Sequence, residues 1–357
     1  MNINVISAAE LSSEQLSQWS ILQQSNPELA SPYFCPEFTV AVASVRPDVY
    51  VAVLEDAGQA VGFFPFQRNR LGIGKPVGGA LSDYHGVIGV KNLRLGPREL
   101  LHGCDLTCWD FDHLIASQEL FQEYHRTIVE SHIMDLSGGF ASYVSRLREN
   151  GSKLLKQTNK SIRRLERHIG PLRFCHQVND IGVLRTLLRW KSAQYRRFGL
   201  VDVFNRFWTV KLLEQIHATS TDDFSGMLSV LYADDELLAV HLGMRSRTVW
   251  HWWFPSHNPE YLRYSPGIVL RLRAAQYAES IGIKIIDMGK GDTSHKFRLR
   301  TGTIKLAEGR VELPSLTTAA RKLYRNTEAW VRRTPLVAVA RVPGRVIKCA
   351  ERKMRFR

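Results

Sequence analysis

Two separate stretches of the chain alternate between apolar and polar residues as paired β-strands do. Residues 49–68 (VYVAVLEDAGQAVGFFPFQR) contain two apolar segments joined by an acidic turn with a glycine. Residues 227–244 (MLSVLYADDELLAVHLGM) repeat this order, and residues 248–254 (TVWHWWF) add a third strand. The repeated pattern predicts two related domains in tandem.

Between these stretches the apolar residues recur at helical spacing. They predict helices over 152–170, 181–199 and 204–218, with a strand over 171–178 between the first two. Helices separated by meanders and single strands indicate an α+β, or mixed α/β, fold in which each domain has a central mixed sheet flanked by helices. We expect the domain boundary between Gly138 and Ser152. The predicted segments are an N-terminal domain over 1–145, a C-terminal domain over 150–315 and a basic tail over 317–357.

A further helix is predicted to begin directly after the second meander. Ser265, Pro266 and Gly267 form its start, because proline is tolerated in a first turn where its missing N–H costs nothing. A helix start presents unpaired backbone N–H groups, which favour a phosphate, and Gly267 lets a ligand approach the main chain.

Charged residues then follow a short apolar run, residues 283–289, that has the character of a buried central strand. Ligands of open α/β sheets bind at such strand ends. Two glycines, Gly289 and Gly291, would let the chain turn tightly here. Neither a phosphate-binding P-loop nor a dinucleotide fingerprint is present. A turn with solvated charges is the alternative for the charged residues Asp287, Lys290, Asp292 and Lys296.

Together these segments resemble a known family of acyltransferases. The helix start Tyr264-Ser265-Pro266-Gly267 and the later series Asp287, Gly289, Gly291, Asp292 and Lys296 are similar to the CelD/BcsL group of the GNAT superfamily, relatives of the FemAB aminoacyltransferases. The resemblance covers about residues 150–310 and is thinner before them. His295 stands where the family usually has a tyrosine.

The resemblance implies two GNAT-like domains and an acyl-coenzyme A donor, acetyl-CoA or another acyl-CoA, with no metal. It implies that main-chain N–H groups at the helix start hold the pyrophosphate. Asp292 is then the candidate for acceptor binding or proton removal, Lys296 for stabilising negative charge, and Asp287 for orienting the loop. A salt bridge that only braces the loop is the alternative for these three. The cofactor-binding candidates are Tyr264, Ser265, Pro266, Gly267, Ile268, Gly289, Lys290 and Gly291.

Five other residues are candidates for binding the acceptor. Asp83, Tyr84 and His85 form a polar group within an apolar stretch, for which an ordinary turn is the alternative. Lys191 shares a helical face with Tyr195, and His257 precedes the predicted helix start. His251, among three tryptophans, is interpreted as a packed core histidine.

The formal net charge of +14 is concentrated in the tail. From Thr317 onward, twelve Lys and Arg residues face only Glu328 and Glu351, so the rest of the chain carries about +4. Arginines interleaved with apolar residues suit an anionic membrane surface. The alternatives are a tail that docks on its own domain and, less favoured, nucleic acid, for which no reader motif is present.

Hydropathy, the N-terminal sequence and the cysteines indicate the cellular location. No run of about 20 apolar residues predicts a membrane-spanning helix, and the N-terminus lacks a secretory pattern. Five scattered cysteines fit reduced thiols, and the C-x3-C pair Cys104–Cys108 lacks a second ligand pair for a metal. We therefore expect a cytoplasmic protein, with peripheral membrane contact through the tail.

Three functions are consistent with the sequence. The leading hypothesis is an acyl-CoA-dependent N-acyltransferase acting on an amino sugar, sugar nucleotide or lipid-linked saccharide in polysaccharide biosynthesis. The second takes aminoacyl-tRNA as donor, although no long heptad run for a coiled-coil arm is present. The third is a non-catalytic assembly subunit at the membrane.

Overall fold

The computed structural model describes residues 1–291 and 293–314, which form two compact units. The first unit contains Met1–Leu22, Arg46–Ile128 and the described residues from 307 onward. The second contains Gln23–Val45 and Val129–Leu306. Each unit is therefore built from separate parts of the chain. The predicted boundary near residue 145 groups the residues differently, and the bounds of the two family domains stay a prediction.

The first unit is a mixed sheet with short helices. Its strand order is β1-β2-β3-β4-β6-β13, with β5 paired to β3. Phe64 and Trp109 lie in its core with their ring centroids 4.9 Å apart. Its elements are β1 (Asn2–Ser7), α1 (Ser13–Ser25), β2 (Val49–Asp56), β3 (Gln59–Arg68), β4 (Ile73–Lys75), β5 (Ile88–Gly89), α3 (Pro97–Gly103), β6 (Cys108–Ile115) and the second half of β13 (Gly302–Glu312).

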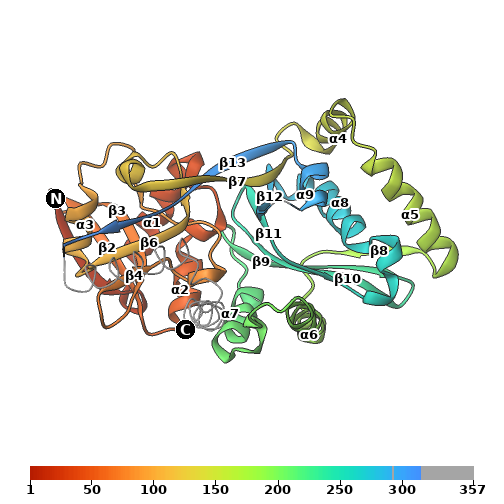
Figure 1. Cartoon of the computed structure of the whole chain (residues 1–357), viewed down its shortest axis with the longest axis horizontal. Coiled ribbons are helices and arrows are strands. Elements are labelled where there is room, and N and C mark those ends of the chain that lie inside the picture. The colour runs from red at the N-terminus through yellow and green to blue at the C-terminus, as the bar shows by residue number, and fades with distance from the viewer. Residues whose placement is uncertain (292, 315–357) are drawn as a thin grey trace, which may run out of the picture. The chain divides into compact units, whose positions relative to one another are not determined.

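The second unit is also a mixed sheet with helices, in the strand order β7-β12-β11-β10-β9-β8. Helices α6 and α7 lie against one face of its sheet and α8 against the other (Figure 1). Its elements are α2 (Pro36–Ala43), β7 (His125–Asp135) from Val129 onward, α4 (Gly139–Glu149), α5 (Leu154–His168), β8 (Leu172–Cys175), α6 (Ile181–Arg197), α7 (Phe207–Ala218), β9 (Ser225–Ala233), β10 (Glu236–Arg245), β11 (Val249–His257), α8 (Pro266–Ala278), β12 (Ile285–Lys290) and α9 (Ser294–Leu299).

Short 3-10 helices connect several of these elements. They are η1 (Ala8–Glu10), η2 (Pro27–Leu29), η3 (Pro32–Phe34), η4 (Gly79–Leu81), η5 (Glu119–Tyr124), η6 (Val203–Asn205), η7 (Pro259–Tyr264) and η8 (Glu279–Ile281).

The predicted hairpins and the mixed α/β class are confirmed. Strands β2 and β3 pair antiparallel, as do β9 with β10 and β10 with β11. The acidic turn of the first hairpin places Ala57 and Gly58 at φ of 48° and 80°. Both angles lie in the left-handed region that a two-residue hairpin turn requires, which is why the glycine stands there.

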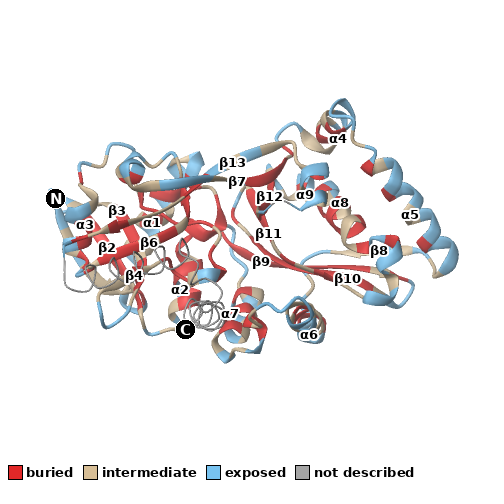
Figure 2. Cartoon of the chain, viewed as in Figure 1, coloured by how far each residue is buried: buried red, intermediate tan, exposed pale blue. Residues whose placement is uncertain are grey.

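The three helices predicted between the meanders are also present, as α5, α6 and α7. Leu154, Thr158 and Leu165 form the buried stripe of α5. Its Lys and Arg residues are exposed on the opposite face, so α5 is drawn largely in the exposed colour in Figure 2. The amphipathic pattern in the sequence therefore gave the orientation of this helix correctly.

An N-terminal segment packs against the meander of the second unit. The ring of Tyr33 lies 5.0 Å from that of His251 and 5.9 Å from that of Trp253. His251 is fully buried, in agreement with its interpretation as a packed core histidine. These aromatic contacts explain why residues 23–45 belong to the second unit, although nearly all of the chain up to residue 128 belongs to the first.

No helix within the described ranges is both long enough and apolar enough to cross a membrane.

Candidate functional site

The end of β12 contains a β-bulge built around Gly289. On β12, Asp287 pairs with Ile133 of β7 and Lys290 pairs with Ser131, so two residues of β12 face one residue of β7. Gly289 occupies the bulge with φ of 73°, a conformation that favours glycine. This answers why a glycine interrupts the apolar run of the sequence: the strand must bend where it ends.

Asp287 holds that bulge from inside the sheet. Its fully buried carboxylate accepts hydrogen bonds from the Ser131 hydroxyl (2.5 Å) and the Gly289 backbone N–H (2.8 Å). His251 Nδ1 lies 4.0 Å from its other oxygen. A buried carboxylate needs such donors. Asp287 is thus placed to fix the loop amide, and a catalytic role for it stays a prediction.

Lys296 holds the same strand end from the side of α9. Its ammonium donates to the carbonyl of Gly289 (3.1 Å) and to that of Lys290 (2.7 Å). Burial, with Arg271 and Lys296 as positive neighbours, lowers the pKa of His295 to about 4, so this imidazole is neutral at pH 7. Asp292, the candidate for proton removal, lies outside the described residues.

Beside this bulge the two central strands part. β11 and β12 pair in parallel at Val249–Ile285, Trp250–Ile286 and His251–Asp287. No pair follows these within the described ranges. Beyond that point β11 stays paired with β10 and β12 stays with β7. The strand ends therefore diverge, which is the kind of place where ligands of α/β sheets bind.

The start of α8 is open to a ligand. Ser265 precedes the helix with φ of 52° and ψ of 50°, and its side chain makes no capping hydrogen bond. The Gly267 N–H makes no hydrogen bond within the described residues. A Cβ built on Gly267 would meet only His257 Nδ1, 4.0 Å away. Packing does not require glycine here, whereas close approach of a phosphate group to the main chain would.

Tyr264 has a structural partner. It is buried, and its hydroxyl lies 2.9 Å from His168 Nδ1 at the end of α5. This pair joins α5 to the segment before α8. The structure thus brings Gly267 and His257 together, and it uses the Tyr264 side chain to hold α5.

Two candidate acceptor residues of the second unit lie near each other. Lys191 on α6 is 9% exposed, and its ammonium donates to Gln194 Oε1 at 3.1 Å. Burial lowers its pKa to about 8. Burial and the charges of Lys191 and Arg197 lower the pKa of the half-buried His257. His257 is therefore neutral at pH 7 and able to accept a proton.

Two buried residues were missed by sequence reasoning. Arg271 of α8 is only 5% exposed, and its guanidinium lies above the ring of Trp252, 5.2 Å from the centroid. His241 of β10 is fully buried and stacked on the same ring at 3.5 Å. Burial, then Arg271, His251 and Lys191, hold the pKa of His241 well below its usual value. The available signal for Arg271 was an arginine among the apolar residues Val269, Leu270 and Leu272.

Asp83, Tyr84 and His85 lie in the first unit, within a network of hydrogen bonds. The backbone N–H groups of Asp112 and His113 donate to His85 Nε2 at 3.2 and 3.0 Å. Asp83 lies 3.6 Å from the His113 ring, and Tyr84 is buried. Their role in binding an acceptor stays a prediction.

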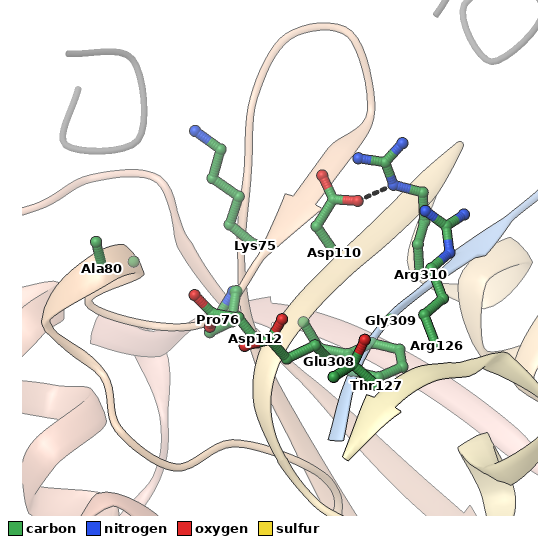
Figure 3. A pocket seen from close by; sticks show the side chains of 12 residues that line it. Lys75, Pro76, Ala80, Asp110, Asp112, Arg126, Thr127, Glu308, Gly309 and Arg310 are labelled. Atoms are coloured by element: carbon green, nitrogen blue, oxygen red, sulfur yellow. Dashed lines mark hydrogen bonds and ion pairs between the residues drawn. The ribbon is translucent and has the colours of Figure 1, made fainter. Parts of the chain in front are cut away.

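A pocket opens beside that network in the first unit (Figure 3). Its volume is about 310 Å³, which is enough for a small molecule. Arg310 lines the pocket and pairs with Asp110, which also lines it. Sequence reasoning missed this pocket, because its walls come from four strands and the loop around Gly79. Its charged lining residues are Lys75, Asp110, Asp112, Arg126, Glu308 and Arg310.

Across residues 1–291 and 293–314 there is no group of three or more His, Cys, Asp or Glu residues that could hold a metal ion.

Comparison with known proteins relates part of the second unit to an acyltransferase domain. Residues 152–297 match the family model of the acetyltransferase (GNAT) domain. The match contains the α8 start and the β12 bulge described above. The comparison supports an acyltransferase in which residues 152–297 are similar to a GNAT domain, and GNAT domains use acyl-CoA. No curated protein matches the chain.

Solved structures with little sequence identity share the fold over most of the chain. A conserved protein of unknown function from Bacteroides thetaiotaomicron is 9% identical with a TM-score of 0.57, covering 87% of this chain and 100% of its own. FemX is 10% identical with a TM-score of 0.55, covering 86% and 96%. The C-terminal domain of a proposed lysylphosphatidylglycerol synthetase from Agrobacterium fabrum is 12% identical with a TM-score of 0.53, covering 88% and 96%.

Proposed function

We propose that this protein transfers an acyl group from an acyl-CoA to the amino group of an acceptor. The observation that carries the proposal is the start of α8: an uncapped helix with Gly267 exposed to open space, beside strands that part. Exposed N–H groups at a helix start favour a diphosphate. Where the strand ends diverge, backbone groups at the edges of β11 and β12 are proposed to bind the rest of a coenzyme A thioester.

In this reaction a C–N bond forms and the C–S bond of the thioester breaks. The amine attacks the carbonyl carbon, coenzyme A leaves, and the amine loses one proton to a base. Asp292 is the candidate base for that proton. His257 lies next to Gly267, where the diphosphate is proposed to bind, and is kept as a candidate for substrate binding. Lys296 and Asp287 serve as positioning residues, because both hold the Gly289 bulge.

The proposed acceptor is an amino sugar, a sugar nucleotide or a lipid-linked saccharide. This acceptor, like polysaccharide biosynthesis and the CelD/BcsL type, rests on the resemblance of the residues 264–267 and 287–296. Release of coenzyme A, measured across amino sugars and nucleotide sugars, tests the acceptor directly.

Gly267→Val tests the donor site. The protein should keep its melting temperature, since only His257 lies near the added side chain. Acetyl-CoA should bind to it at least about tenfold more weakly, because the branched side chain blocks approach to the backbone amides. Titration calorimetry measures both proteins, with Gly96→Val as a control before α3 of the first unit, where φ is −83° and an added Cβ would meet only Glu99 at 3.9 Å. Equal affinity of wild type and Gly267→Val would remove the α8 start from donor binding.

An aminoacyl-tRNA donor is the alternative proposal. The shared fold with FemX and the exposed basic face of α5 favour it. A ligand that binds only the folded state raises the melting temperature. A shift with acetyl-CoA supports the first proposal. A shift with charged tRNA and none with any acyl-CoA supports the second.

Contact with an anionic membrane surface is proposed for residues 317–357, which lie outside the described residues. Liposome flotation at low and high salt, with the full chain and with a chain that ends at residue 316, tests this proposal. If both chains float equally, the tail does not provide the contact.

A further inference from the structure

Arg271 is a buried cation that has no anionic partner in the described part of the chain. Its Nη1 donates to the thioether sulfur of Met288 at 3.4 Å, and its Nε makes no hydrogen bond. Burial lowers its pKa to about 10, a shift opposed only by Tyr143. A buried charge is costly unless it is paired, so a guanidinium held by a sulfur and an indole ring requires an explanation.

Several groups near Arg271 are cationic or neutral. Its charge acts on the Tyr143 hydroxyl and on the imidazoles of His241 and His295, and Lys191 and His251 act on His241 in turn. The nearest carboxylate on β12 is that of Asp287, which already accepts from Ser131 and Gly289. Both imidazoles stay neutral beside the guanidinium because their pKa values are lowered, so they supply no negative charge to it, and a negative ligand would.

The position of Arg271 connects it to the proposed donor site. It lies four residues after Gly267 on α8, so the two residues share one face of the helix. Its side chain reaches both Trp252 of β11 and Met288 of β12. These are the first residues beyond His251 and Asp287, where the parallel pairing ends. Helix α8 packs against β11 on one face of the sheet. The guanidinium therefore stands where the two strands separate.

We propose that Arg271 binds a carboxylate of one of the two substrates, which assigns this enzyme to carboxylate-bearing acyl groups or carboxylate-bearing amines. The inference rests on the proposed acyl transfer. A guanidinium fits a carboxylate with two parallel hydrogen bonds, and Nε is available for one of them. The carboxylate comes either from the end of the acyl chain of the donor or from the acceptor.

The test compares ligand pairs that differ in a carboxylate. For the donor, succinyl-CoA is titrated against butyryl-CoA. For the acceptor, glucosaminuronic acid is titrated against glucosamine, and leucine against 3-methylbutylamine, in the presence of coenzyme A. We expect the wild type to bind the carboxylate member of the donor pair or of an acceptor pair roughly tenfold to a hundredfold more tightly.

Three variants of the full chain assign any preference to Arg271. Arg271→Met should abolish the preference and leave the affinity for acetyl-CoA unchanged, whereas Arg271→Lys should keep part of it. Arg273→Met is the matched control on the same helix, since Arg273 is half-exposed and donates to Gln276.

Each outcome decides the proposal. If the wild type prefers succinyl-CoA and Arg271→Met removes this preference, the proposal is supported and the carboxylate belongs to the donor. If the removed preference is found in an acceptor pair, the proposal is supported and the carboxylate belongs to the acceptor. No preference in the wild type, or one that survives in Arg271→Met, overturns it. So does a general loss of affinity and of melting temperature in Arg271→Met, which marks a structural role. Acetyl-CoA binding is measured separately, so a failure of the proposed transferase function is recognised independently.

Discussion

Two guanidinium groups, the buried one of Arg271 and the partly buried one of Arg310, differ in their partners. In the first unit, Arg310 pairs with Asp110 and with Glu312, the latter at 3.1 Å. Burial acts to lower its pKa, but the hydrogen bonds and charges of those two carboxylates outweigh burial and raise it. In the second unit, Arg271 has a sulfur and an aromatic ring as neighbours, and burial lowers its pKa to about 10.

The presence or absence of counter-ions distinguishes a cation that stabilises the fold from one that is available to a ligand. A buried cation that serves only the fold is expected to have its counter-ions in the chain, as Arg310 does. A buried cation without them adds nothing to stability and is retained for another reason. Arg271 lies where β11 and β12 part, and this position gives it that reason.

The largest expected effect is on Arg310. Arg310→Met leaves Asp110 and Glu312 without their cation, and removing one partner of a partly buried ion pair destabilises the fold. Removing one partner of a fully buried pair costs about 3–5 kcal/mol of unfolding free energy. Because both carboxylates are partly exposed, we expect a loss at the lower end of this range, about 3 kcal/mol. Chemical denaturation measures it. A loss below about 0.5 kcal/mol would show that the pair contributes nothing.

The next effect is the pH dependence caused by Lys191. Its folded pKa, about 8, lies below the ordinary value of 10.5, so the unfolded chain holds this proton more tightly. Below pH 8 the penalty for the buried charge is complete. It is relieved as the pH rises toward 10.5, so stability gains about 2 kcal/mol between pH 8 and pH 10.

Lys191→Met should remove this part of the pH dependence, and denaturation curves at both pH values for the two proteins measure it. Lys211→Met is the control, because Lys211 is exposed and pairs with Glu214. Parallel pH profiles for wild type and Lys191→Met would contradict the burial of a charged amine at this position.

The smallest expected effect on stability is that of replacing Arg271. Its sign is opposite to the effect of replacing Arg310. Replacing an unpaired buried charge by a side chain of similar volume is often neutral or stabilising, so Arg271→Met should gain between 0 and about 2 kcal/mol. Arg273→Met should change stability by less than about 0.5 kcal/mol. Thermal unfolding of both measures the difference. A clear loss in Arg271→Met would make the two guanidinium groups alike.

Local patterns in the sequence predicted the elements that line the candidate site. Alternation gave the β9–β10–β11 meander, and the run Ser265-Pro266-Gly267 gave the start of α8. The glycine at 289 indicated a distortion at the end of β12, and the bulge has its positive φ there. Each of these features depends on the conformation of a few neighbouring residues. A local pattern in the sequence is therefore enough to predict it.

Other features depend on contacts between distant residues. Lys191 belongs to a helix with several exposed arginines, and Arg271 shares α8 with the half-exposed Arg273. Only the packing of α6 and α8 on the sheet decides which of these cations are buried. The parting of β11 from β12 depends on β7, which pairs with the outer edge of β12. The placement of residues 23–45 in the second unit depends on Tyr33 meeting β11. The two partners of each of these contacts lie far apart in the sequence, so no local pattern predicts the contact.

The discontinuity of the two units sets the order in which they are able to form during synthesis. Strand β12 needs β7 from one side and β11 from the other, and the aromatic contacts of Tyr33 wait for the meander about 200 residues later. The first unit needs the second half of β13, with Ala307 and Val311 in its core. Neither unit is complete until the chain has emerged from the ribosome past β13. We therefore expect slow, late folding dominated by non-local pairing, and a poor yield from any fragment cut near residue 145.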